Sequence, residues 1–177
     1  MAALGNQREK ISPEVLHSCF IATSGLVRSQ IIEIAGVEAP TIQNWIKRGW
    51  VPNPVQKKYT INHLARILII KMLRDVLQLE KIAAVLTYVN GDANDLSDNI
   101  VSEFELYSYI YQIISYTEQS SQFSLPVLEE YIEKCTADYA EAFAGARAKL
   151  QAALKAVMLA FTAAKLKRQA DEMIQTF

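Results

Sequence analysis

Apolar side chains recur at intervals of three and four residues along most of the chain, which is the spacing of amphipathic helices. The longest such pattern covers 61–77, and its apolar face consists of Leu64, Ile67, Leu68, Met72, Leu73 and Val76. The charged face of this helix holds Arg66, Lys71 and Arg74. The pattern predicts an all-α fold, with helices over 12–22, 28–35, 40–48, 61–77, 79–89 and 100–114, one that starts at Ser124, and an Ala-rich helical region after it.

Two of the short helices form a helix-turn-helix pattern. Gly36 follows the helix over 28–35, where a left-handed cap is expected, and Pro40 opens the next helix after the turn "GVEA". Gly49 ends that second helix. Two short helices joined by about four residues that include Gly are typical of this motif.

The second helix of the motif has two distinct faces. Successive side chains rotate by about 100° around a helix, so Ile42, Trp45 and Ile46 share one arc. The opposite arc combines amides with cations: Gln43, Asn44, Lys47 and Arg48. Such donors suit base edges and phosphates. The alternative that this is an ordinary amphipathic surface helix remains open.

The segment "WVPNPVQKKY", 50–59, cannot be helical, because Pro52 and Pro54 lack backbone donors. An extended segment, followed by a turn and a segment that runs back, predicts a short hairpin-like β-wing. Lys57 and Lys58 would lie at its tip or return strand, within reach of phosphate. Trp50 and Tyr59 are expected to anchor this wing by packing.

Composition adds a charge pattern to this picture. The net charge is only −1, but 28–74 holds eight Lys/Arg against two Glu, whereas 75–143 holds thirteen Asp/Glu against two Lys. The basic stretch is centred on the helix-turn-helix and the wing. An anionic partner for that half is therefore expected.

Candidate chemistry for an enzyme is scarce. The two cysteines are 116 positions apart, the two histidines have no ligand or nucleophile at helical spacing, and no phosphate-binding or nucleophile motif occurs. The acidic loop 92–98 lacks the central Gly of a calcium loop. We expect no enzyme activity, metal or cofactor. The short apolar runs and free thiols indicate a cytoplasmic protein without a membrane span.

The C-terminal half leaves two questions open. Tyrosines at 107, 109, 111 and 116 favour packing, with a pocket for an unidentified small-molecule effector as the alternative. Phe143, Leu150, Val157 and Ala164 recur every seven residues, flanked by Leu154 and Phe161. Such a seam occurs both in dimerising coiled coils and in helices packed on their own domain.

The segments "IIEIAGVEAPTIQNWIKRGWVPNP", "KKYTINHLARI" and "LEKIAAVL" resemble the winged helix of MerR-type regulators over about 26–90. Over about 25–117, "IQNWIKRGWV", "KKYTINHLARILIIKMLR" and "ELYSYIY" are more similar to a bacterial family of unknown function that is itself MerR-like. The resemblance implies a homodimer on double-stranded DNA, with the second helix in the major groove and the wing on the backbone. MerR proteins have Arg and Tyr where this chain has Gln43 and Asn44.

The sequence thus predicts a DNA-binding transcriptional regulator with two regions. Residues 1–90 form the winged-helix region, and 91–177 serve dimerisation or interaction. The residues predicted to contact base edges or adjacent phosphates are Gln43, Asn44 and Lys47. Those predicted to contact the DNA backbone are Arg48, Lys57, Lys58 and Arg66. The alternative is a protein-interaction module in which the helix-turn-helix is structural and the acidic segment meets a basic partner.

Overall fold

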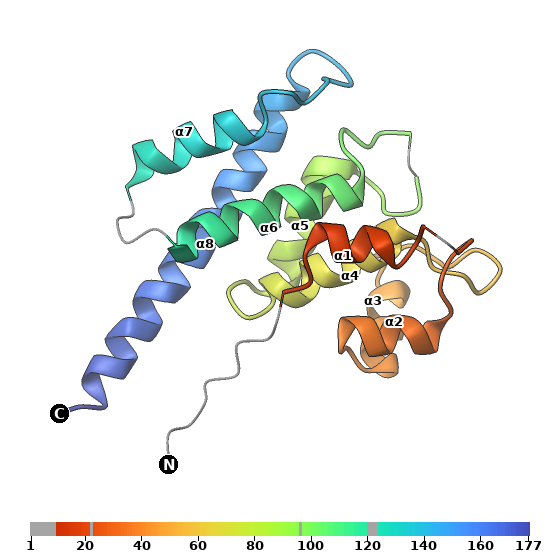
Figure 1. Ribbon diagram of the computed structural model, residues 1–177, viewed down its shortest axis with the longest axis horizontal. Helices are drawn as coiled ribbons and strands as arrows, with labels where there is room; N and C mark the ends of the chain where they lie inside the picture. Colours follow the sequence, from red (N-terminus) through yellow and green to blue (C-terminus); the bar gives the residue numbers. More distant parts are fainter. Residues whose placement is uncertain (1–9, 22, 96, 120–123) are drawn as a thin grey trace.

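The computed structural model describes residues 10–21, 23–95, 97–119 and 124–177. In these ranges the chain forms eight helices and no strand, which confirms the all-α prediction for them (Figure 1). The helices are α1 (Pro13–Ser18), α2 (Arg28–Ala35), α3 (Ala39–Lys47), α4 (Ile61–Leu73), α5 (Leu79–Asn90), α6 (Glu103–Gln119), α7 (Leu125–Cys135) and α8 (Ala146–Ile174).

Side-chain caps set the starts of α1, α6 and α7. The Ser12 hydroxyl accepts from the backbone N–H of Val15, and the Ser124 hydroxyl accepts from that of Val127. The helix expected from residue 100 begins only at Glu103, because Ser102 and Glu105 cap it reciprocally. Local polar chemistry therefore decides these boundaries more sharply than apolar spacing does.

Helix α4 lies at the centre of the molecule, where α1, α2, α5 and α6 pack around it (Figure 1). Every residue from 63 to 70 is buried. Between residues 63 and 70 the helix has no solvated face. The predicted charged face therefore does not hold for Arg66, whereas Lys71 and Arg74 are partly exposed.

Arg66 shows the consequence of this coverage. Its side chain is only 2% exposed, its guanidinium forms an ion pair with Glu103, and its Nε donates to the carbonyl of Trp50 at 2.6 Å. Asn90 donates to the same Glu103 oxygen at 3.1 Å. The prediction that Arg66 contacts the DNA backbone is therefore wrong, because α6 covers this side chain and supplies its counter-charge.

The buried core continues across residue 90. Leu106, Tyr107 and Ile110 of α6 belong to the same buried cluster as the apolar residues of α4. The Asn62 side chain of α4 also accepts from the backbone N–H of Phe104 at 3.1 Å. The two regions predicted from the sequence, 1–90 and 91–177, thus share one core.

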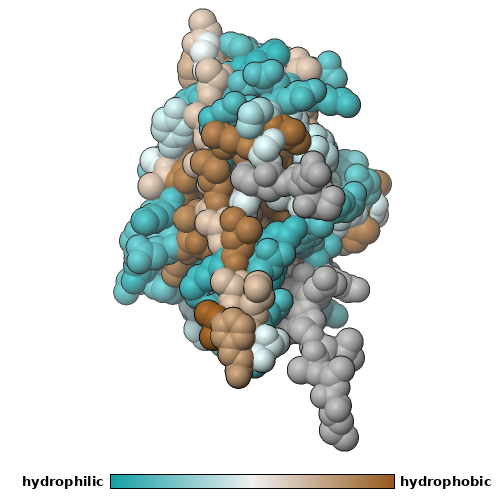
Figure 2. Space-filling model, turned by 90° about the vertical axis from the view of Figure 1, so that its left-hand side faces the viewer, coloured by the Kyte–Doolittle hydropathy of each residue, from teal (hydrophilic) through white to brown (hydrophobic). Residues whose placement is uncertain are grey.

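Helix α8 packs against α5, α6 and α7 over its first half and projects beyond them over its second (Figure 1). Leu150, Leu154 and Val157 are at most 1% exposed, so the middle of the predicted heptad seam packs within the chain. Figure 2, a view from the side where α8 ends, shows apolar surface between polar patches. Within the described ranges, no helix is both long and apolar enough to span a membrane.

Candidate nucleic-acid interface

The candidate interface begins with α2 and α3. Gly36 has a φ of 60°, and its N–H donates to the Ile32 carbonyl at 2.8 Å, which ends α2 and turns the chain. Val37 in the turn is buried, as are Ile42 and Trp45 on the inner face of α3. These contacts bury the inner face of α3 and leave its outer face uncovered.

The outer side of α3 is exposed as its amphipathic pattern predicts. It presents the expected amides and cations: Gln43, Asn44, Lys47 and Arg48. Helix α3 itself contains no acidic residue. This face is therefore accessible to a partner and locally positive.

Arg48 has two neighbours that orient it. Its guanidinium lies 4.9 Å from the centroid of the Trp50 ring. Its Nη1 is also 3.7 Å from Oε1 of Glu80 on α5, in a pair that is largely exposed. Exposed pairs of this kind contribute little to stability, about 0–1 kcal/mol. Glu80 thus positions Arg48 without burying its charge.

The wing loop, residues 50–59, does not form the predicted β-wing. In the described part of this region only isolated bridges occur, between Leu26 and Tyr59 and between Val55 and Lys58. Pro52 and Pro54 interrupt the first arm, and a proline cannot donate to a ladder. The expected strands are therefore replaced by a loop that ends in a tight turn.

The turn at the tip has an unusual backbone. Lys58 N–H donates to the Val55 carbonyl at 2.8 Å, and the two residues between them, Gln56 and Lys57, have φ of 49° and 62°. Positive φ at both central positions is typical of the turns that close two-residue hairpins. Lys57 and Lys58 are exposed at this tip, as the sequence predicts.

The base of the wing loop is held by backbone contacts. Leu26 and Tyr59 exchange two backbone hydrogen bonds, of 2.9 and 2.8 Å. A Cβ on Gly25 would lie 3.1 Å from the Tyr59 carbonyl, so this glycine allows the close approach. Tyr59 is buried and Trp50 is partly buried, which confirms their predicted packing roles.

His63 of α4 holds the middle of the wing loop. The Thr60 N–H donates to its Nδ1 at 3.1 Å, so Nε2 carries the proton and donates to the Asn53 carbonyl at 3.2 Å. Burial lowers the pKa of His63, and only the hydrogen bond to Asn53 opposes this shift. The neutral imidazole is therefore part of the wing anchor.

The acidic loop contributes a second contact to the wing loop. The Asn94 side chain accepts from the backbone N–H of Asn53 at 3.1 Å, and Asn94 is itself held by Asp92. Across the described residues, no cluster of three His, Cys, Asp or Glu could hold a metal ion. The observed role of this loop is to support the wing.

Arg28 was not assigned to the site from the sequence, although it belongs to the basic stretch. It is the exposed first residue of α2. Arg28 lies two residues after Leu26, whose backbone pairs with that of Tyr59 in the wing base. Burial raises the pKa of Tyr59, and the charge of Arg28 opposes that shift. Arg28 therefore extends the basic surface from the wing loop onto α2. These elements lie at the end of the molecule far from the C-terminus (Figure 1).

The tyrosine cluster of α6 lies elsewhere and is engaged in packing. The Tyr107 hydroxyl donates to the Ile11 carbonyl, and burial raises the pKa of this phenol. The Tyr116 ring stacks on that of Tyr131 at 3.9 Å between centroids. Both contacts agree with the packing interpretation of these residues.

Comparison with known proteins finds similarity over part of the chain. Residues 27–110 match a family described as a domain of unknown function, DUF1836. An uncharacterized protein of Bacillus subtilis (strain 168), YkrK, is 27% identical over 109 residues, which cover 57% of this chain and 47% of that protein. The chain thus spans about half the length of this relative. No solved structure matches.

The family match bears directly on the candidate interface. It runs from the residue before α2 into α6 and so includes α3, the wing loop and His63. It confirms the resemblance to a family of unknown function, whereas the MerR-like part of that resemblance stays a prediction. Residues 27–110, which include all the residues predicted to contact DNA, are therefore similar to a family of unknown function.

Proposed function

We propose that this protein binds double-stranded DNA through α3 and the wing loop, as a cytoplasmic transcriptional regulator of the MerR-like type. One observation carries the proposal. The buried side of α3 is apolar, and its exposed side presents amides and cations beside a turn whose tip carries Lys57 and Lys58. A partner that meets this surface has to accept hydrogen bonds and carry negative charge.

DNA meets both requirements in a defined geometry. A major groove is wide enough for α3, where Asn44 and Gln43 can bond an adenine edge and Lys47 can reach a guanine or a phosphate. The wing loop then lies over the neighbouring backbone, where Lys57, Lys58 and Arg48 contact phosphates. Arg28 supplies a further cation at the N-terminus of α2.

The wing contacts are tested by the salt dependence of binding to a labelled duplex. Each lost phosphate contact lowers the slope of log K against log salt by about 0.9. We expect this decrease for Lys57→Ala and for Lys58→Ala separately, and about twice the decrease for the double variant. Lys134→Ala, which removes the same charge from the exposed surface of α7, is the matched control. An unchanged slope in both wing variants would refute the wing contact.

The base contacts need a different measurement. Selection of bound fragments from random duplexes should enrich a defined sequence with the wild-type chain. Asn44→Ala should cost about 1–3 kcal/mol on that sequence and little on other DNA. If the wild-type chain retains no duplex at all, the interaction module with a basic partner replaces this proposal. The exposed acids of the segment 75–143 would then form its binding surface.

A further inference from the structure

Trp50 joins the end of α3 to the start of the wing loop, and its backbone is held from both sides. Its N–H donates to the Trp45 carbonyl of α3 at 2.9 Å, and the N–H of Val51 donates to the same carbonyl at 3.3 Å. The Trp50 carbonyl accepts from Nε of Arg66 on α4 at 2.6 Å. The position of this junction therefore depends on α3 and on α4 together.

A second donor of α4 holds the same arm of the wing loop. Nε2 of His63 donates to the Asn53 carbonyl at 3.2 Å. His63 and Arg66 lie three residues apart and so share one side of α4, and the carbonyls that they meet, at 50 and 53, are also three residues apart. Pro52, between these carbonyls, cannot donate to a strand ladder. Side-chain donors from α4 thus replace the backbone ladder that this arm lacks.

The shape of the Arg66 side chain suits two partners at once. A guanidinium is a planar fork with several donors, whereas a lysine side chain carries a single ammonium nitrogen. Nε of Arg66 serves the Trp50 carbonyl, and Nη1 serves Glu103 at the start of α6. Asn90, the last residue of α5, donates to Glu103 at 3.1 Å and accepts from the Val101 N–H at 3.4 Å. Arg66 thus ties the junction to the place where α5 ends and α6 begins.

Stability alone is a weak reason for an ion pair at this place. Taking two charges out of water is costly, and well-packed apolar residues of similar volume often stabilise a core as well as a buried pair does. An apolar pair would have no donor for the Trp50 carbonyl. The ion pair of Arg66 and Glu103 therefore adds something that an apolar pair lacks, which is a fixed distance between α6 and the junction.

The junction in turn supports an exposed cation. The Arg48 guanidinium lies 4.9 Å from the centroid of the Trp50 ring. A guanidinium is attracted to the face of an indole ring, so the ring restricts where this cation lies. The exposed pair of Arg48 with Glu80 of α5, at 3.7 Å, holds it from another side. The buried guanidinium of Arg66 and the exposed one of Arg48 are therefore linked through a single residue, Trp50.

We propose that Arg66 and Glu103 are positioning residues for the contact with DNA. They fix Trp50, and Trp50 sets Arg48 and the wing loop at a defined distance from the outer face of α3. Neither Arg66 nor Glu103 touches DNA. Their role rests on the proposed function, because it concerns the same surface of α3 and the wing loop. Without the hydrogen bond from Arg66 the junction shifts, and Arg48 no longer reaches its phosphate although its charge is still present.

The salt dependence of duplex binding tests this role with Arg66→Lys. The change keeps a positive charge beside Glu103 but cannot reproduce both donor positions of the guanidinium. We expect the slope of log K against log salt to decrease by about 0.9, the value for one phosphate contact. Arg48→Ala should give the same decrease, and the double variant should show no further decrease, because the contact is already lost. Additive decreases, or an unchanged slope in Arg66→Lys, overturn the proposal.

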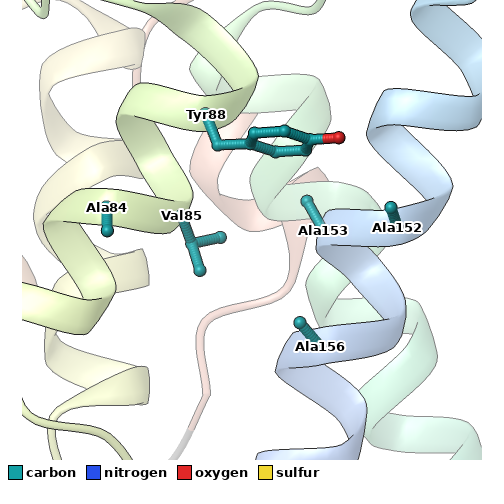
Figure 3. A pocket seen from close by; sticks show the side chains of 6 residues that line it. All are labelled: Ala84, Val85, Tyr88, Ala152, Ala153 and Ala156. Carbon is teal, nitrogen blue, oxygen red and sulfur yellow. The ribbon is translucent and has the colours of Figure 1, made fainter.

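Two further variants separate positioning from a general loss of stability. Arg66→Met with Glu103→Leu replaces the ion pair by an apolar pair, and it should decrease the slope as Arg66→Lys does while it still melts cooperatively. This variant keeps the test valid if Arg66→Lys does not fold. Val85→Ala alters α5 outside the network, in the groove of about 350 Å³ between α5 and α8 (Figure 3). It should leave the slope unchanged, and an equal decrease there would overturn the positioning role.

A measurement without DNA distinguishes a failure of the positioning role from a failure of the proposed function. The chain has two tryptophans, so a ¹⁵N-labelled sample gives two indole N–H signals, which Trp50→Phe assigns. Arg66→Lys should shift the Trp50 signal and leave that of Trp45, which is 1% exposed in the core, nearly in place. A wild-type chain that binds no duplex refutes the proposed function. An unchanged Trp50 signal in Arg66→Lys refutes the positioning role.

Discussion

Arg66 is a charged residue of the buried core. Its guanidinium and the Glu103 carboxylate are almost completely buried, and the Trp50 carbonyl and the Asn90 amide complete the network. The second carboxylate oxygen of Glu103 has no partner among the described residues. Removing one member of such a pair leaves an uncompensated charge in a medium of low dielectric constant.

We therefore expect Arg66→Met to lower the free energy of unfolding by about 3–5 kcal/mol. Glu103→Leu should destabilise the fold in the same way, and the double variant should lose much less than the sum of the two single losses. Urea unfolding of the four proteins measures this coupling. Lys47→Met, on the exposed face of α3, is the control and should change stability by no more than about 0.5 kcal/mol. Additive effects of the two core substitutions would contradict a functional ion pair.

The wrong prediction for Arg66 shows that local sequence does not reveal contacts with distant segments of the chain. Helical spacing placed Arg66 on a charged face, and an arginine in that position is usually solvated. Its partner lies 37 residues further on, in α6. The exposure of Gln43, Asn44 and Lys47 was predictable because it depends only on the local inner face of α3.

At the scale of single elements, the wing turn stores backbone strain. Lys57 has a φ of 62°, a region that costs an L-residue other than Gly about 1 kcal/mol or more. Lys57→Gly should therefore raise the free energy of unfolding by up to about 1 kcal/mol relative to Lys57→Ala. Both variants lose the same charge, so both should show the same reduced salt slope on DNA. Equal stabilities of the Gly and Ala variants, from thermal unfolding, would rule out this strain.

The His63 anchor makes the stability of the fold depend on pH. Burial lowers the pKa of His63 in the folded state below its ordinary value of about 6.5 in the unfolded chain. The unfolded chain then binds more protons in this range, so stability is complete above about pH 6.5 and falls as the pH drops towards the folded-state pKa. Unfolding between pH 7 and pH 5 should show this loss in the wild type.

The matched variants separate His63 from other titrating groups. His63→Gln removes the imidazole and should flatten the pH dependence over that range. His17→Gln removes the exposed histidine of α1 and should leave it unchanged. A pH dependence that survives in His63→Gln would assign the effect to other groups.

The elements themselves were predictable to different degrees. Caps and glycines, such as Ser12, Gly36 and Ser124, marked the helix ends correctly, because these signals act within one turn of the backbone. The β-wing was not predictable in the same way. A ladder needs donors in register on two arms, and Pro52 interrupts one arm while Leu26, far back in the sequence, pairs with the other.

At the scale of the whole molecule, the sequence does not show which helix faces pack against each other. The sequence indicates a heptad seam in α8, and the structure buries its middle against α5, α6 and α7. On the outer side of α8, the exposed residues Leu159, Leu166 and Met173 recur with the same period. Periodicity identifies a helix face that packs, but it does not identify the segment that packs against it.

The shared core leads to a prediction about folding units. A chain truncated after Asn90 keeps every residue predicted to contact DNA but not the support that Asn94 gives the wing loop. It loses α6, which covers α4 and pairs Glu103 with Arg66. It would leave a buried helix exposed and a core arginine without its counter-charge, so we expect no cooperative thermal transition by circular dichroism. Extending the chain to Gln119 restores α6, and a cooperative transition should return at a lower temperature than in the full chain, because α8 is still missing. A cooperative transition in the shorter chain would show that the interface folds alone, and the packing of α4 on α6 would then join two separately stable units.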